Sequence, residues 1–339
     1  MKTNKSPAPS GDAAPAEVLA SPAETRENLL KVTGRGYTVV RHILRQHPDD
    51  VADRTSVLGP MVTERKRRSL QLYLLLLTMW GWLESQDEPI TSAVWARALS
   101  TAKGRRWTPS NVSGAWTDLE HRGLIERRRV QHGLVVALRR EDGKAAYTKP
   151  GRVKGDRRET YFVLPAEFWT DEWFETLSLP GLALLLIIAG ETSDKDEVWL
   201  TNADAAKWYG LSPRSIEAGI EDLREHGLLH ERVEWIKAPL SAIGATKRHW
   251  YSLTGSFSYS ARAEAQDAAR AELEARTKSR TRRKGAKAST KATITKSATG
   301  AKKTTGAKKS ASTRKSIVKK SNAKPTSGNS RSRRARGAP

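Results

Sequence analysis

A helix-sized sequence that occurs twice constrains the fold of this chain more than any other feature. The first copy reads "PSNVSGAWTDLEHRGLI" over 109–125, and the second reads "PRSIEAGIEDLREHGLL" over 213–229. The identical positions fall at the helix start, along one helical face and at the helix end: Pro109/Pro213, Asp118/Asp222, Leu119/Leu223, Gly123/Gly227 and Leu124/Leu228. A repeated structural unit must agree at those places, so we predict a duplicated domain.

Each copy carries signals for both ends of one helix. Pro109 and Pro213 suit the first helical position, and each follows a hydroxyl side chain that can cap the helix. Gly123 and Gly227 can adopt the left-handed conformation that ends a helix. Small and apolar residues at helical spacing define a buried stripe in each copy: Val112, Ala115, Trp116 and Leu119, then Ile216, Gly219, Ile220 and Leu223.

The repeat extends upstream of this helix. A leucine-rich run over 70–82 aligns with 180–192, and a short helical pattern over 90–99 aligns with 200–210. The first copy carries about six extra residues around 101–106, between its second and third predicted helices. The leucine-rich runs are shorter than the ~20 apolar residues that a membrane crossing needs, so we predict buried core helices.

Each copy continues downstream into strand-like sequence. In the first copy two β-rich runs flank Gly133, and in the second the predicted strands are 229–237 and 247–254. Three helices followed by a β-hairpin is the order of a winged helix-turn-helix. We therefore predict a mainly α protein with small β-hairpins, built from two tandem winged helix-turn-helix domains flanked by disordered termini.

Composition assigns the segments outside the repeats. Both ends are rich in Pro, Ala, Ser or Lys and cannot bury a core, whereas "ENLLKV" and "TVVRHILRQ" show short helical patterns. The predicted division is 1–24 (disordered), 25–60 (short helical segment), 61–145 (first winged helix), 146–160 (linker), 161–256 (second winged helix), 257–277 (Ala-rich helical spacer) and 278–339 (disordered basic tail).

The net charge of +23 is concentrated at one end of the sequence. From Thr277 onward there are 21 Lys and Arg residues and no Asp or Glu, which leaves 39 basic against 37 acidic residues in 1–276. A basic chain without aromatic residues neutralises phosphates but cannot stack on bases. We expect the tail, including Arg282, Arg283 and Lys284, to add sequence-independent affinity for double-stranded DNA.

The outward faces of the two repeated helices differ in chemistry. Those expected in the first copy are uncharged: Ser110, Asn111, Ser113 and Thr117. Those expected in the second copy include carboxylates: Arg214, Ser215, Glu217, Ala218 and Glu221. Uncharged donors and acceptors can contact base edges, whereas carboxylates repel a polyanion. We predict that the first copy reads bases, and that the second contacts phosphate or, alternatively, protein.

We predict that cations on the two hairpins contact phosphates or an adjacent minor groove. The residues are Arg127, Arg128, Arg129, Arg139 and Arg140 in the first hairpin, and Lys237, Lys247 and Arg248 in the second. The basic run "ERKRR" over 64–68 precedes the first core helix and is a further candidate for backbone contact.

No motif for catalysis or for a cofactor is evident. The seven histidines lack a metal-binding spacing, and without cysteine no thiolate can bind a metal or act as a nucleophile. No G-x-x-x-x-G-K-[ST] phosphate loop occurs, and "GRGYTV" over 34–39 lacks the third glycine of a dinucleotide site. We therefore expect a protein that is not an enzyme and that has neither metal nor cofactor.

Residues 55–257 resemble a family of actinobacterial tandem winged-helix proteins. The resemblance rests on "SVLGPMVTERKRRSLQLYLLLLTMW", "FWTDEWFETLSLPGLALLLIIAGET", "GLLHERVEWIKAPLSAIG" and "WYSLTG". It implies two winged helix-turn-helix domains and DNA binding. The two-domain plan is also similar to that of plasmid replication initiators. The tail is similar in composition to linker-histone tails and to the Lys/Ala-rich extensions of some actinobacterial HU proteins.

These observations predict a DNA-binding protein of the cytoplasm, located on the nucleoid and independent of membranes. Regulation of transcription is the expected use. One alternative is replication initiation at a plasmid or integrated-element origin, where tandem domains bind repeated sites. Another is nucleoid architecture, in which the tail dominates DNA binding. In either case the second domain is a candidate surface for a second copy of the chain or for replication or transcription proteins.

Overall fold

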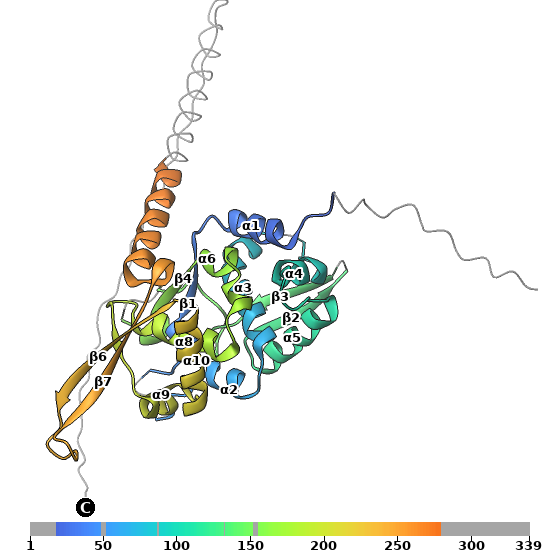
Figure 1. Cartoon of the computed structure of the whole chain (residues 1–339). Helices are drawn as coiled ribbons and strands as arrows, with labels where there is room; N and C mark the ends of the chain where they lie inside the picture. Colours follow the sequence, from blue (N-terminus) through green and yellow to red (C-terminus); the bar gives the residue numbers. More distant parts are fainter. Residues whose placement is uncertain (1–17, 49–51, 87, 132, 152–154, 279–339) are drawn as a thin grey trace, which may run out of the picture. The chain divides into compact units, whose positions relative to one another are not determined.

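Figure 1 shows a computed structural model of the chain, in which residues 18–48, 52–86, 88–131, 133–151 and 155–278 are described. Within these residues helices predominate and the strands form small antiparallel sheets, as predicted. The described residues belong to one compact unit. Most of the predicted disordered N-terminus, and the tail from 279 onward, lie outside the described residues.

The N-terminal segment differs from the prediction in two ways. Helix α1 (Pro22–Thr33) begins inside the segment predicted to be disordered, because Ser21 and Glu24 form a reciprocal capping box. "TVVRHILRQ" is not a helix: it forms strand β1 (Tyr37–Arg41) and a 3-10 turn, η2 (His42–Leu44). Strand β1 is stabilised by antiparallel pairing with β4 (Tyr161–Pro165), a partner that its local pattern does not reveal.

The first repeat has the predicted order of three helices and a hairpin. After the short helix α2 (Leu58–Thr63), its elements are α3 (Arg67–Leu83), α4 (Ser92–Leu99), α5 (Pro109–His121), β2 (Ile125–Val130) and β3 (Gly133–Leu138). Strands β2 and β3 pair from Ile125↔Leu138 to Val130↔Gly133, as a hairpin that turns next to Gly133.

The second repeat has the same order with one added strand. It follows η3 (Arg157–Glu159), β4, α6 (Glu167–Thr170) and α7 (Trp173–Thr176). Its elements are α8 (Leu179–Glu191), β5 (Val198–Trp199), α9 (Asn202–Tyr209), α10 (Pro213–Glu225), β6 (Leu229–Lys237) and β7 (Ala245–Leu253), with a 3-10 turn, η4 (Gly255–Phe257), after them. The sheet order is β5-β7-β6, so the unpredicted β5 lies at one edge.

The two leucine-rich helices form the centre of the core. Helix α3 is buried from Ser69 to Met79 and helix α8 from Gly181 to Gly190. The predicted stripes of α5 and α10 are buried as well, with α5 packed on α3 and α4, and α10 packed on α8 and α9. Among the described residues no helix is long and apolar enough to cross a membrane.

The aspartate shared by the two repeats, Asp118 or Asp222, interacts with the start of the first helix in each repeat. Asp118 of α5 pairs with Lys66, the residue that precedes α3, at 3.2 Å. Asp222 of α10 accepts hydrogen bonds from the amide (2.8 Å) and hydroxyl (2.7 Å) of Ser178, the N-cap of α8. In both repeats a carboxylate of the third helix therefore lies at the start of the first, where the helix dipole favours negative charge.

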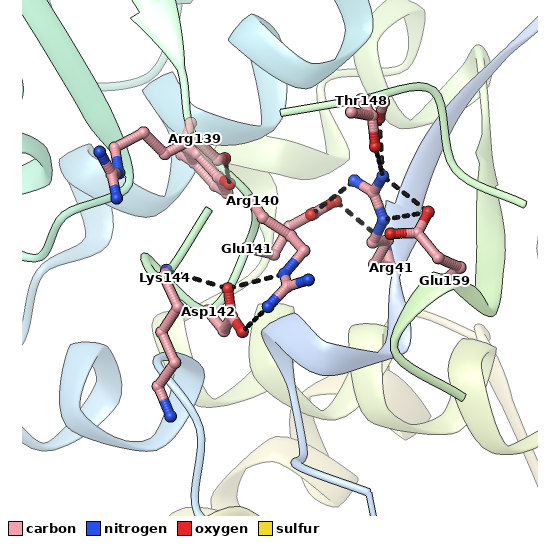
Figure 2. A network of polar contacts seen from close by, with 9 residues as sticks. Arg41, Arg139, Arg140, Glu141, Asp142, Lys144, Thr148 and Glu159 are labelled. Atoms are coloured by element: carbon pink, nitrogen blue, oxygen red, sulfur yellow. Dashed lines mark hydrogen bonds and ion pairs between the residues drawn. The ribbon is translucent and has the colours of Figure 1, made fainter. Parts of the chain in front are cut away.

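A buried arginine joins the N-terminal segment to the region between the repeats (Figure 2). The Arg41 guanidinium donates to Glu141 (2.9 Å), to Glu159 (3.0 Å) and to the backbone carbonyl of Thr148 (2.7 Å), and it lies over the Tyr147 ring. Arg41 and Glu141 are fully buried. The predicted linker, 146–160, thus has a buried network at both of its ends, although 152–154 lie outside the described residues.

The helix over residues 259–278 is more than the solvated spacer that the sequence predicts. Arg262 in its first turn is buried and donates to the backbone carbonyls of Ala189 (2.6 Å) and Thr192 (2.8 Å) at the end of α8. These are carbonyls that an α-helix leaves without an internal partner. Burial lowers the pKa of Arg262 to about 10. Beyond this docked turn, residues 270–278 are exposed, as predicted.

The half-buried ring of His42 makes stability depend on pH. Its Nδ1 accepts from the Arg45 guanidinium at 2.7 Å, and burial, followed by the Arg45 charge, lowers its pKa to about 3. An unfolded histidine binds a proton below about pH 6.5, so this group destabilises the fold as the pH falls from 6.5 towards 3. Between pH 7 and pH 5 we expect wild type to lose about 1–2 kcal/mol more unfolding free energy than His42→Gln. Urea unfolding at both pH values measures this, and equal losses would contradict it.

Candidate nucleic-acid interface

The outward face of α5 is uncharged from Ser110 to Thr117, as the sequence predicts, and carries the exposed Glu120 in its last turn. Ser110, Ser113 and Thr117 are exposed. Asn111 is only partly exposed, because its side-chain oxygen accepts from the amide of Thr108 at 3.1 Å while the Thr108 hydroxyl accepts from the amide of Asn111 at 3.2 Å. The structure therefore gives Asn111 a capping role, and Ser110, Ser113 and Thr117 form the free face of this helix. The Thr117 hydroxyl donates to the Ser113 carbonyl at 3.1 Å and faces outward as an acceptor.

The arginines of the β2–β3 hairpin divide into two groups. Arg127 pairs with Glu120, Arg139 pairs with Glu126, and Arg140 pairs with Asp142 at 2.7 Å. The hydrogen bond from Arg127 lowers the pKa of the Glu120 carboxyl, as expected of an ion pair. Arg128 and Arg129 are exposed, and neither has a partner in the described part of the chain. These two guanidiniums remain free to contact phosphate.

A basic loop before α5 was missed by sequence reasoning. Lys103, Arg105 and Arg106 are exposed in the loop 100–108 between α4 and α5. The corresponding loop of the second repeat, 210–212, is six residues shorter. The change in alignment offset already revealed this insertion, and its "KGRR" sequence was the available signal. One set of cations therefore precedes α5 in the chain, in this loop, and a second set follows it, on β2.

Three of the four cations in the basic run 64–68 contact other parts of the protein, whereas Arg65 is exposed and has no ion pair among the described residues. Lys66 pairs with Asp118, and Arg67 pairs with Glu175 at 3.5 Å. Arg68 lies 5.7 Å from the ring centroid of Trp107. Partial burial acts to raise the pKa of the Asp118 carboxyl, but hydrogen bonds from Arg122, Ser69 and Lys66 hold it below its ordinary value.

The outward face of α10 is charged and largely engaged within the second repeat. Arg214 is exposed, and the amide of Ser215 donates to the N-cap hydroxyl of Ser212 at 3.1 Å. Glu217 accepts from Asn202 at 3.1 Å. Glu221 and Glu231 both pair with Arg224, and His249 contacts Glu231 as well. The internal bonds reduce the negative field of this face without removing its carboxylates.

The cations of the β6–β7 hairpin lie against aromatic rings. The Lys247 ammonium is 5.1 Å from the ring centroid of Trp235, and the Arg248 guanidinium is 4.4 Å from that of Trp199. Lys247 is exposed and Arg248 is partly exposed, and neither cation has an acidic partner among the described residues. The predicted tail contacts, Arg282, Arg283 and Lys284, lie outside the described residues.

Comparison with protein families, curated proteins and solved structures gives no match for this chain. The described residues also contain no group of three or more His, Asp or Glu side chains that could hold a metal ion. The function must therefore be inferred from the surfaces themselves.

Proposed function

We propose that this chain is a double-stranded DNA-binding protein, with regulation of transcription as its use. The observation that carries the proposal is the free face of α5, which presents Ser110, Ser113 and Thr117 without a carboxylate among them. Serine and threonine hydroxyls can donate to or accept from base edges in a major groove, and they bring no negative charge near the phosphates. The tandem winged helix-turn-helix interpretation gives α5 the place of the recognition helix in the first domain.

The positions of the free cations support the proposal that α5 lies in a major groove. Lys103, Arg105 and Arg106 precede the start of α5, and Arg128 and Arg129 lie on the strand that follows it. Phosphate contacts on both sides of a groove fix the register of a helix, while the groove-facing residues supply the sequence preference. The acidic face of α10 makes the second repeat the weaker candidate for reading bases.

Selection of bound sequences from random duplex DNA tests the proposal. It is carried out with the full chain and, in parallel, with residues 1–278, which contain the compact unit but not the main part of the tail. We expect 1–278 to enrich one sequence motif and the full chain to bind the same motif more tightly. Binding by the full chain alone, without a motif, would contradict sequence reading by α5.

That contrary result would favour a nucleoid-architectural protein as the second candidate. The observation in its favour is the concentration of 21 Lys and Arg residues from Thr277 onward, in a stretch without acidic residues. Such a tail binds any duplex, with an affinity that falls steeply as salt rises. The repeats would then contact protein, and their free cations would be irrelevant to DNA affinity.

The free cations of β2 give a quantitative prediction. In residues 1–278, Arg128→Ala/Arg129→Ala should weaken binding to the selected duplex and reduce the slope of log K against log salt by about 2, since each phosphate contact contributes about 0.9. A titration by fluorescence anisotropy at several salt concentrations measures the slope. The control Lys31→Ala/Arg270→Ala removes two exposed cations from other helices and should leave the slope unchanged. Equal slopes for wild type and the β2 variant would remove these residues from the interface.

A further inference from the structure

The β6–β7 hairpin ends in an exposed apolar tip. Strands β6 and β7 extend beyond the helices of the second repeat as a two-stranded ribbon (Figure 1). The connecting segment, 238–244, reads "APLSAIG". Leu240 is 103% exposed and Ile243 is 74% exposed, and Trp235 is 59% exposed on the neighbouring strand. Most of the surface of these three apolar side chains is therefore uncovered.

Hydrogen bonds hold the tip in a defined shape. The amide of Ala238 donates to the carbonyl of Gly244 at 2.9 Å, and the amide of Ser241 donates to the carbonyl of Ala238 at 2.9 Å. The Ser241 hydroxyl donates to the carbonyl of Ala245 at 2.8 Å. Gly244 has a φ of +70°, a conformation that a side chain disfavours. Leu240 and Ile243 are therefore presented by a folded turn, which lowers the entropy lost when they bind.

The surface beside the tip is positively charged. Lys237 and Lys247 lie on the two strands close to the tip, and Arg248 follows. The carboxylate in the same part of the ribbon, Glu234, accepts a hydrogen bond from the Trp250 indole at 2.7 Å. An apolar end flanked by lysines is complementary to a ligand that has an apolar interior between two lines of negative charge. A base-pair step in the DNA minor groove has that character.

The positive charges beside the tip disfavour a second copy of the chain as its binding partner. In a symmetric contact through the tip, each residue of one copy lies near the same patch of the other. Lys237 and Lys247 of the two copies would then approach one another, at a contact that buries only the short segment 238–244. Duplex DNA satisfies both the lysines and the apolar side chains.

We infer that the β6–β7 ribbon is a minor-groove wedge, in which Leu240 and Ile243 insert at a base-pair step and kink the duplex. This inference rests on the proposed DNA-binding function and assigns to the second repeat a task that does not require α10 to read bases. Lys237 and Lys247 contact the phosphates on either side of the groove. Apolar wedges that unstack a step bend DNA by roughly 20–90°.

The bend is measured on the full chain by energy transfer between dyes at the two ends of a duplex that carries the selected motif. We expect wild type to bend this duplex by roughly 20–90°. Leu240→Ser/Ile243→Ser should lose at least half of the bend while its Kd rises less than about tenfold, because the lysines and the first repeat still bind. The control Val32→Ser/Leu273→Ser removes apolar side chains that are 46% and 61% exposed elsewhere and should keep the bend.

Failure of the wedge and failure of the proposed function are distinguishable. If the protein binds no duplex, both fail. A duplex that is bound but straight, or a bend that is unchanged in Leu240→Ser/Ile243→Ser, overturns the wedge alone. A bend unchanged in that variant together with loss of a dimer in sedimentation would assign the tip to a second copy of the chain instead.

Discussion

Ser113→Glu/Thr117→Glu should lower the affinity of residues 1–278 for their selected duplex by at least roughly tenfold. Loss of recognition at one base pair of a site typically costs about 1–3 kcal/mol, and a carboxylate at these positions adds repulsion from phosphates. Both positions are exposed on the free face of α5. Anisotropy titrations against the selected and a scrambled duplex measure the effect, which we expect to be larger for the selected one.

The duplication supplies a matched control for this experiment. Ser113 and Thr117 align with Glu217 and Glu221 of the second repeat, so the variant gives α5 the acidic pattern that α10 already has. The reciprocal variant, Glu217→Ser/Glu221→Thr, should change the affinity less than about threefold. A larger change there, with none in the α5 variant, would identify α10 as the reading helix. Glutamate is at least as good a helix former as serine or threonine, so α5 itself should remain folded.

Arg41→Met should lower the unfolding free energy of the compact unit by about 3–5 kcal/mol, because the buried Glu141 carboxylate loses its counter-charge. Arg41 also donates to Glu159 and to the Thr148 carbonyl, so the variant leaves several buried acceptors without a donor. Urea unfolding followed by tryptophan fluorescence measures the change. A loss below about 1 kcal/mol would mean that water or rearrangement satisfies these groups.

Two further variants separate this mechanism from general damage. Arg41→Met/Glu141→Met should be more stable than Arg41→Met alone, because it removes the uncompensated carboxylate along with the guanidinium. Arg270→Met breaks an exposed pair with Asp267 and should change stability by no more than about 0.5 kcal/mol. If the double variant is no better than Arg41→Met, loss of packing rather than unpaired charge explains the effect.

The Arg41 network also bears on how the two repeats act together. It links β1 to the end of the first repeat through Glu141 and to the segment before the second through Glu159. Strand β1 in turn pairs with β4, which packs on α8. We expect Arg41→Met to weaken binding to a duplex that needs both repeats more than it weakens binding to half of that duplex.

The order of helices and strands in the two repeats could be predicted because its signals are local. Proline, hydroxyl caps and left-handed glycines act within a few residues of a helix end, and Gly123 and Gly227 have φ values of +69° and +66°. Side-chain periodicity places Val112 and Ile216 on buried faces for the same reason. Strand β1 could not be found in this way, because its β-branched residues are compatible with several local structures and its partner β4 is distant in sequence.

The sequence by itself therefore determined the duplication, the core helices, both hairpins and the uncharged outward face of α5 from Ser110 to Thr117. Only the tertiary structure decided which cations are free. Arg127 and Arg128 are neighbouring arginines that the sequence does not distinguish. Arg127 is paired with Glu120, whereas Arg128 is exposed. It also decided that the predicted linker begins and ends in a buried network and that Leu240 and Ile243 form an uncovered tip. Periodicity and capping depend on neighbours along the chain, whereas ion pairing and burial depend on which distant residues folding brings into contact.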